Sequence, residues 1–279
     1  MDRMENLTNQ QYQKFCDFLE KHSGIVLGPT KQYLVVNRLT PLLGVFNCSS
    51  LSELLEKTED ITQRHLRTQV IDAMTTNETL WFRDTYPYNM LKNTILPELA
   101  RQKSMGQIRI WSAASSSGQE PYSIAMTCFE TNIPRLRTPM GVQILGTDIS
   151  PTMLSMCKSG IYDYIALNRG LSPERKRAFF TKIDDQTMQV NDALKRLVTF
   201  RHLNLLENFS GMGKFDVIFC RNVLIYFSPQ IKSMIVDHMA NCLNPNGYLF
   251  LGASESITGL TERFEMIRCN PGIAYRLVK

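Results

Sequence analysis

The chain has 279 residues, of which 43% are hydrophobic and 20% charged, with a formal net charge of +5, and this composition is typical of a folded protein with one large domain or two modest ones. The mild positive charge would suit an acidic partner but lacks the clustered basic character of a dedicated nucleic-acid binder, and no apolar run reaches the ~18 residues of a membrane span. No signal peptide is evident, and seven scattered cysteines and four histidines without ligand spacing predict a cytoplasmic protein with reduced thiols and no metal site.

Residues 8 to about 75 show helical periodicity only. Thr8 and Gln11 have the spacing of a capping box, and the helix that they open is expected to end at Gly24. Three more helices are expected, one through residues 33–42, a short one capped by Ser50, and one opened by Asp60 or Thr62. Four short helices predict a small bundle-like domain over residues 1–75.

The polar faces of this helical domain carry four basic side chains, Lys31, Arg38, Arg64 and Arg67. Taken alone, such charges usually form only a solvated face. Residues 76–106 are expected to link this domain to the rest of the chain. They comprise a segment with neither helical nor strand period, followed by a helix from about Tyr88 to Arg101.

From Gln107 onward, strand and helix patterns alternate. Five strands are expected at residues 108–112, 142–147, 198–203, 215–220 and 248–251, and a closing hairpin at 264–268 and 273–277. Helices are expected at residues 120–131, after a cap at Ser150, and around 231–242. This alternation predicts an α/β, doubly wound parallel sheet over residues 107–279, with antiparallel strands at one edge. Residues 160–197 break the pattern with a helix at 172–180 and a hairpin turning at Asp184 and Asp185, and they predict a small β insertion.

Polar groups follow four of the parallel strands, at the edge where such sheets bind ligands. Residues 113–118 are all small, Asp148 and Asn204 end two strands, and Arg221 ends a fourth. Each feature has an ordinary alternative: a βα turn needs small residues, Asp148 could cap a helix, Asn204 could be a turn residue, and Glu120 could be only a first-turn acid. Taken together, they indicate a cleft shaped for a nucleoside.

The missing motifs narrow the identity of this ligand. A nicotinamide cofactor would require G-x-G-x-x-G, and a P-loop would require G-x-x-x-x-G-K-[ST]; neither is present. No lysine or arginine stands beside the small-residue loop to meet a phosphate. A nucleoside without phosphates and with a modest polar tail, S-adenosylmethionine, fits better.

Three segments resemble the signature segments of the CheR-type chemotaxis receptor methyltransferases. They are Asn77-Glu78-Thr79-x-x-Phe82-Arg83, Ala114-Ser115-Ser116-Ser117-Gly118-Gln119-Glu120-Pro121-Tyr122-Ser123, and Phe219-Cys220-Arg221-Asn222-Val223-Leu224-Ile225-Tyr226-Phe227. The resemblance implies a class I S-adenosylmethionine-dependent methyltransferase sheet and an all-α N-terminal domain that recognises the substrate. It also implies methyl esterification of glutamate side chains on chemoreceptors, with S-adenosylhomocysteine as product. The partner would be the cytoplasmic helical bundle of a chemoreceptor, approached by a monomer that neither binds nucleic acid nor inserts into a membrane.

The resemblance also assigns residues. It implies a cofactor site made of Asn77, Thr79, Arg83, Ala114, Glu120, Asp148, Asn204, Leu205, Arg221 and Asn222. The four basic residues of the helical domain would bind the substrate. One departure concerns the hairpin at residues 182–188, which is short and lacks glycine. Relatives that dock on a receptor's C-terminal peptide have a longer, glycine-containing loop there, so no such tether is expected.

The chemistry would need no general base, because a free glutamate with a pKa of about 4.3 is already an anion at pH 7. Catalysis would then rest on positioning and desolvation, with Arg83 and Tyr226 arranging the acceptor carboxylate. Tyr226 could instead be only a half-buried packing residue. Two other functions stay open. The first is methylation of nucleic acid or a small molecule, although the D/N-P-P-[YF] motif of amino-group methylation is absent, since Val223 and Leu224 follow Asn222. The second is a non-catalytic module that binds S-adenosylmethionine.

Overall fold

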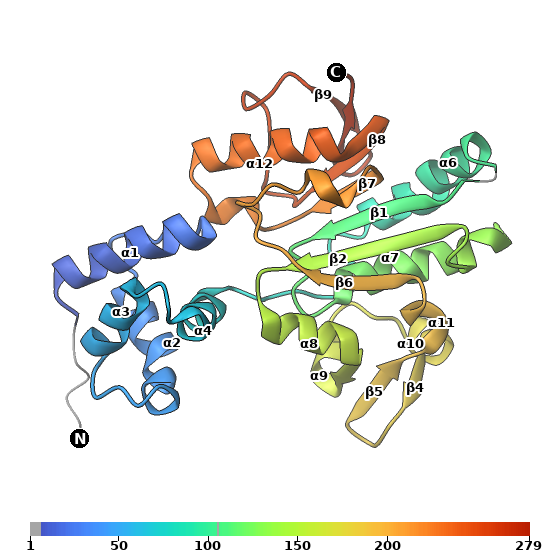
Figure 1. The fold of residues 1–279 in the computed structure, drawn as a ribbon. Coiled ribbons are helices and arrows are strands. Elements are labelled where there is room, and N and C mark those ends of the chain that lie inside the picture. Colours follow the sequence, from blue (N-terminus) through green and yellow to red (C-terminus); the bar gives the residue numbers. More distant parts are fainter. Residues whose placement is uncertain (1–6, 105) are drawn as a thin grey trace.

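The computed structural model describes residues 7–104 and 106–279 (Figure 1). Its N-terminal part is a helical unit of α1 (Asn9–Ser23), α2 (Gln32–Val45), α3 (Leu51–Glu59) and α4 (Arg64–Met74). Their inward side chains form a hydrophobic cluster of their own. Within the described ranges, no helix combines the length and the apolar character needed to cross a membrane.

The capping signals in this unit are confirmed, with one exception. The Thr8 capping box opens α1, Gly24 ends it with φ +77°, and Ser50 caps α3. The predicted start of the fourth helix at Asp60 or Thr62 is wrong, because the Asp60 carboxylate accepts hydrogen bonds from the Thr62 N–H and hydroxyl in a local turn. Helix α4 therefore begins only after this turn.

The linker helix is continuous but irregular. It runs as α5 (Tyr86–Met90), a single π-helical turn η1 (Leu91–Ile95) and α6 (Leu96–Gln102), so it begins two residues before the predicted Tyr88. Its buried leucine and isoleucine side chains pack against the sheet together with α7 (Gln119–Phe129).

The central sheet has seven strands in the order β6-β2-β1-β7-β8-β10-β9. The strands are β1 (Ile108–Ala113), β2 (Val142–Asp148), β6 (Val198–His202), β7 (Phe215–Cys220), β8 (Leu243–Leu251), β9 (Phe264–Arg268) and β10 (Ile273–Leu277). The first five in this spatial order are parallel, and β10 pairs antiparallel with both β8 and β9. The predicted parallel sheet with an antiparallel edge is therefore confirmed.

Alternate residues of the central strands enter two different cores. Ile108 and Ile110 face the cluster that contains α7, whereas Trp111 and Ala113 face the cluster that contains α12 (Pro229–Cys242). Figure 1 shows α12 on one side of the sheet and α7 with α8 (Pro151–Ser159) on the other. Helices thus cover both faces, as the doubly wound prediction requires. Strand β8 starts five residues before the predicted 248–251, because it continues through a register shift opposite Phe215.

The insertion forms a separate three-stranded antiparallel sheet. The predicted helix and hairpin correspond to α10 (Pro173–Phe179), β4 (Phe180–Lys182) and β5 (Thr187–Val190). The sequence prediction missed β3 (Ile161–Asp163), which pairs with β5, and the short helices α9 (Tyr164–Asn168) and α11 (Asp192–Lys195). Figure 1 shows the β4–β5 hairpin projecting downward from the sheet unit.

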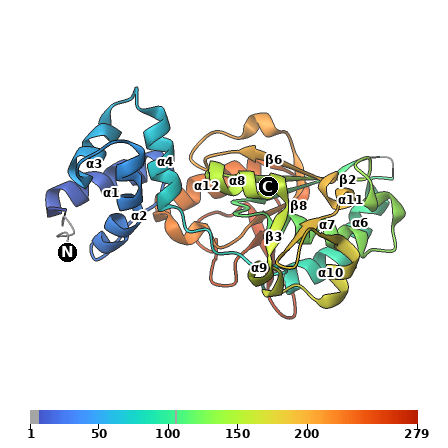
Figure 2. The same cartoon turned by 90° about the horizontal axis from the view of Figure 1, so that it is seen from below.

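The helical unit meets the sheet unit at the carboxyl ends of the parallel strands (Figures 1 and 2). The N–H of Val26, just after α1, donates to the carbonyl of Tyr226 at 2.9 Å. The Asn204 amide, just after β6, donates to the carbonyl of His22 at 2.7 Å. These contacts place residues from both units around one space.

Candidate functional site

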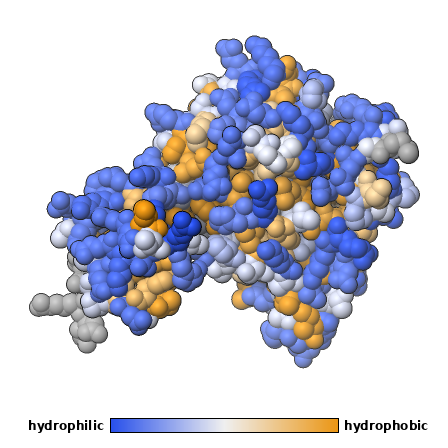
Figure 3. All heavy atoms as spheres, in the orientation of Figure 1, coloured by the Kyte–Doolittle hydropathy of each residue, from blue (hydrophilic) through white to orange (hydrophobic). Residues whose placement is uncertain are grey.

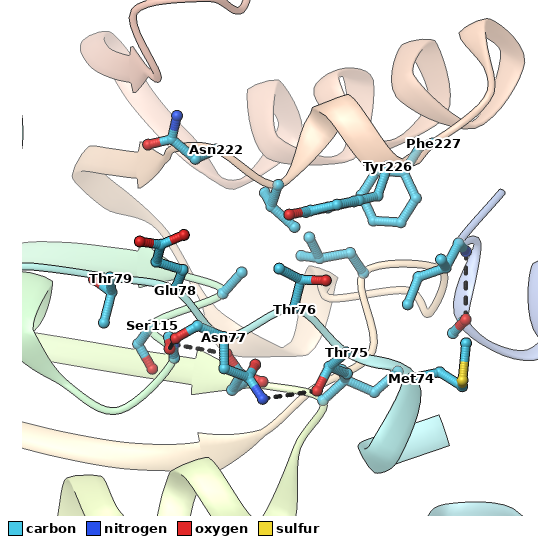
Figure 4. Close-up of a pocket in the computed structure, with 18 of the residues that line it drawn as sticks. Met74, Thr75, Thr76, Asn77, Glu78, Thr79, Ser115, Asn222, Tyr226 and Phe227 are labelled. Atoms are coloured by element: carbon cyan, nitrogen blue, oxygen red, sulfur yellow. Dashed lines mark hydrogen bonds between the residues drawn. The ribbon is translucent and has the colours of Figure 1, made fainter. Parts of the chain in front are cut away.

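A cavity of about 400 Å³ lies where the two units meet. The face drawn in Figure 3 is mostly hydrophilic, with hydrophobic side chains showing between the units, and Figure 4 shows the cavity wall in close-up. Residues from α1 to Thr75 come from the helical unit and include 25–28, and residues 76–80, Arg83 and Tyr88 come from the linker. The other residues belong to the ends of the parallel strands or to the segments that follow them. The predicted site residues on this wall are Lys31, Arg38, Asn77, Thr79, Arg83, Ala114, Glu120, Asp148, Asn204, Leu205, Arg221, Asn222 and Tyr226. Arg64 and Arg67 are not part of it.

A buried guanidinium stands at the centre of the strand ends. The Arg221 side chain is 1% exposed, and its Nη1 donates to Glu120 Oε2 at 3.2 Å. Its Nη2 donates to Asp84 Oδ2 at 2.6 Å and to the carbonyl of Arg83 at 2.8 Å. Burial raises the pKa of the Glu120 carboxyl, while Arg221 and a hydrogen bond from Ser112 favour its charged form. Three distant segments are therefore joined by one cation.

The small-residue loop after β1 has a constrained backbone. Ala114 and Ser116 have φ of +57° and +49°, in the left-handed region that side chains usually avoid. The Ser116 N–H donates to Asp148 Oδ2 at 2.8 Å, and the Ser150 N–H donates to Asp148 Oδ1 at 2.9 Å. Burial raises the pKa of Asp148, and these two N–H groups oppose the rise. Asp148 thus shapes the loop in addition to facing the cavity.

Three buried polar atoms of the residues on this wall have no hydrogen-bond partner among the described residues: Tyr88 Oη, Ser115 Oγ and Arg221 Nε. Buried polar groups are normally paired in native structures. A polar ligand in the cavity would supply hydrogen-bond partners to unpaired hydroxyl and N–H groups of this kind.

The linker is fixed to both units. Arg38 donates to the carbonyls of Met74 and Thr75, just before the linker, at 2.7 and 2.9 Å and to the Thr76 hydroxyl at 3.2 Å. The Ser116 hydroxyl donates to the carbonyl of Asn77 at 2.8 Å. Trp81 is fully buried, and its indole N–H donates to Ala166 of the insertion. The guanidinium of Arg38 is therefore engaged where the helical unit joins the linker, a contact that the sequence did not indicate.

Arg83 and Tyr226, predicted to act together, both lie on the cavity wall. Tyr226 ends the 3₁₀ turn η4 (Leu224–Tyr226), and its hydroxyl points into the cavity near Thr76 (Figure 4). Arg83 donates to the carbonyl of Glu78 at 3.3 Å. In the described part of the chain, no carboxylate lies within ion-pair distance of Arg83.

The remaining basic side chains of the helical unit differ in their surroundings. The Arg67 guanidinium lies 5.7 Å from the centre of the Phe18 ring and contacts the His22 imidazole. Lys31 and Arg64 are exposed, and no carboxylate of the described residues lies within ion-pair distance of either. Of the four basic residues predicted to bind the substrate, Lys31 and Arg64 are thus the two that remain available to an external partner.

The sequence prediction missed the apolar part of the wall. Residues 25–28 carry no polar signature, and only their position after the Gly24 turn brings them to the cavity. The predicted site residues also omit Glu78 of the first signature segment, which lies on the wall and pairs with Arg169 of the insertion at 2.8 Å.

Two family models match the chain. Residues 10–75 match "CheR methyltransferase, all-alpha domain", and residues 77–273 match "CheR methyltransferase, SAM binding domain". Chemotaxis protein methyltransferase 1 of Vibrio cholerae is 59% identical over 97% of this chain and 98% of that protein. The protein of the same name from Pseudomonas aeruginosa is 50% identical over 96% and 98%. The chemotaxis protein methyltransferase of Salmonella typhimurium is 33% identical over 93% and 88%.

The Arg221 network predicts a large effect on stability. Replacing Arg221 with Met should lower the free energy of unfolding by about 3–5 kcal/mol, because Glu120 would be left buried without its cation. Arg177→Met, which removes an exposed ion pair with Glu174, should change it by less than about 1 kcal/mol. Urea denaturation followed by circular dichroism measures both. Equal effects of the two substitutions would contradict a structural role for the buried network.

Proposed function

Because the chain belongs to the CheR methyltransferase family, we propose that it methylates the side-chain carboxylates of glutamates on chemoreceptors and forms methyl esters. It is a chemotaxis protein methyltransferase that uses S-adenosylmethionine. The observation that carries the proposal is the cavity at the strand ends, whose wall contains the matching positions of all three signature segments. Label transfer from S-adenosylmethionine to a panel of purified receptors tests it, and release of the label by base marks an ester. A base-stable product would contradict glutamate esterification.

The cavity wall suits the cofactor. Asp148 keeps lone pairs beyond those used by the two backbone N–H groups, and we assign it to the ribose hydroxyls. The unpaired Ser115 hydroxyl lies on the same wall. The other holding residues would be Asn77, Thr79, Arg83, Ala114, Glu120, Asn204, Leu205, Arg221 and Asn222. When bound, S-adenosylmethionine supplies an electrophilic methyl group on a sulfonium.

The residues that face the acceptor have a positioning task. A glutamate carboxylate needs no base at neutral pH, so orientation and exclusion of water remain for the protein to supply. The charge of Arg221 is neutralised by Glu120 and Asp84, which leaves Arg83 as a cation on the wall for the acceptor. Tyr226 adds a phenolic hydrogen bond to the same carboxylate.

The chemoreceptor would be engaged through the helical unit. Receptor methylation regions are Glu-rich helical bundles, as the family implies, and exposed Lys31 and Arg64 would steer such a surface toward the cavity. The hairpin of the insertion turns within residues 183–186, where the Asp184 carboxylate accepts the N–H groups of Gln186 and Thr187. This compact turn supports docking without a C-terminal peptide tether.

Cofactor affinity should depend on Asp148. Asp148→Ala should weaken S-adenosylhomocysteine binding about tenfold or more, since losing a charged acceptor typically costs ~1.5–3 kcal/mol. Asp148→Asn, which keeps one acceptor oxygen, should bind with intermediate affinity. Asp163→Ala is the matched control, because Asp163 also caps a backbone N–H but lies outside the cavity. Calorimetry measures the affinities, and an unchanged value for Asp148→Ala removes this residue from the site.

Turnover should depend on Arg83 and Tyr226 more than cofactor affinity does. Arg83→Ala and Tyr226→Phe should each lower kcat for receptor methylation, because both side chains would act on the acceptor as the methyl moves. Tyr164→Phe, on an exposed ring of the insertion, serves as the control for loss of a phenolic hydroxyl. If Tyr226→Phe turns over as fast as the wild-type protein, the Tyr226 hydroxyl has no part in the reaction and the residue has a packing role only.

Receptor engagement should depend on exposed charge. Lys31→Glu combined with Arg64→Glu should raise the apparent KM for receptor and leave cofactor affinity unchanged. The difference should shrink with added salt, because exposed charges are screened beyond a Debye length of ~8 Å at physiological ionic strength. Arg196→Glu with Arg268→Glu makes the same charge change on exposed positions of the other unit. Removal of the receptor's last residues should have little effect on methylation. If this removal abolishes methylation and the charge reversal leaves KM unchanged, the insertion holds the substrate instead of the helical unit.

A further inference from the structure

Glu255 lies outside the cavity wall but contacts the loop that carries Asn222 and Tyr226. It follows β8, and its carboxylate accepts three backbone N–H groups. The Oε2 atom accepts from Asn222 and from Gly252, both at 2.7 Å, and Oε1 accepts from Ile225 at 3.3 Å. One partly buried carboxylate therefore joins the ends of two neighbouring strands, β7 and β8.

The loop after β7 has little regular structure to hold it. Asn222 has φ +59°, and the only helical turn is the three-residue η4. The N–H groups of Tyr226 and Phe227 bond only within the loop, to Val223 and Leu224. A conformation of this kind persists only where surrounding contacts determine it.

The chain leaves room for this carboxylate at Gly252. A Cβ atom at this position would lie 2.5 Å from Asn222 Nδ2 and 2.8 Å from Glu255 Oε2. Any larger residue would push the carboxylate or the Asn222 amide aside. Gly252 and Glu255 thus form one arrangement, in which the β8 end approaches the β7 end closely enough for a single side chain to bond to both.

We propose that Glu255 is a positioning residue for methyl transfer, which fixes Asn222 and Tyr226 through their shared backbone. Hydrogen bonds from N–H groups to a carboxylate are charge-assisted and stronger than neutral ones. Misplacing a reacting-site group by about 1 Å can cost a large factor in rate. The effect of Glu255 on turnover rests on the proposed role of Tyr226, whereas its effect on Asn222 concerns cofactor binding alone.

The experiment is a double-mutant cycle between Glu255 and Tyr226. Glu255→Ala should lower kcat at least about tenfold, since three N–H groups lose their acceptor, and should change the KM for receptor much less. Glu255→Gln, which keeps one acceptor oxygen, should lie between it and the wild type. In a Tyr226→Phe background, Glu255→Ala should cost less than about threefold, because the group that it positions is already missing. Glu262→Ala, on the same segment with a side chain 96% exposed, is the control.

The outcomes separate this proposal from the proposed function. Wild-type kcat in Glu255→Ala, or equal costs in both backgrounds, overturns the positioning role. If the melting temperature shows that Glu255→Ala does not fold, the cycle with Glu255→Gln decides. If the wild-type protein forms no base-labile ester on any receptor, the proposed function fails. Glu255 is then judged by S-adenosylhomocysteine affinity, which should fall at least about threefold in Glu255→Ala through the displaced Asn222.

Discussion

The buried Arg221 guanidinium is the constraint on which the site depends. A charge removed from water is tolerated only when it is paired and hydrogen-bonded. The two carboxylates that satisfy it come from the first turn of α7 and from the linker, while Arg221 itself ends β7. Segments that are more than a hundred residues apart must therefore converge for the fold to form. The three motifs that identify the family are, physically, the three parts of one buried network.

The helical unit is part of the cavity wall as well as the proposed docking surface. Its residues 25–28 form one wall of the cavity, and the Val26 N–H holds the carbonyl of Tyr226. Gly24 allows this approach, since a Cβ there would lie 2.8 Å from the Phe227 ring and the backbone has φ +77°. A main-chain hydrogen bond thus joins the helical unit, where docking is proposed, to Tyr226, which is proposed to face the acceptor.

Much of the fold follows from local patterns. Period-2 alternation predicts the strand at 108–112, and a side-chain cap at Ser150 predicts the start of a helix. Both features depend on neighbouring residues only, and the structure contains both. The misses have causes of another kind. Strand β3 has three residues, too few for any period, and α4 starts late because a side chain competes for the backbone in a turn. Glu255 bonds only to backbone N–H groups, which every residue but proline carries, so no pattern of side chains reveals it.

Most of the non-glycine residues with positive φ lie where the chemistry is proposed, and Asn47 and Asn246 are the exceptions among the described residues. Phe82, Asp84, Ala114, Ser116 and Asn222 all have positive φ without being glycine, and all belong to the three signature segments or border them. Each such residue costs stability unless its neighbours determine it. Here the neighbours do so: Asp148 holds Ser116, Ser123 holds Phe82, and Glu255 holds Asn222. The proposed reaction needs no general base and depends on positioning and exclusion of water, and local departures from sequence preference are expected where a site must supply precise geometry.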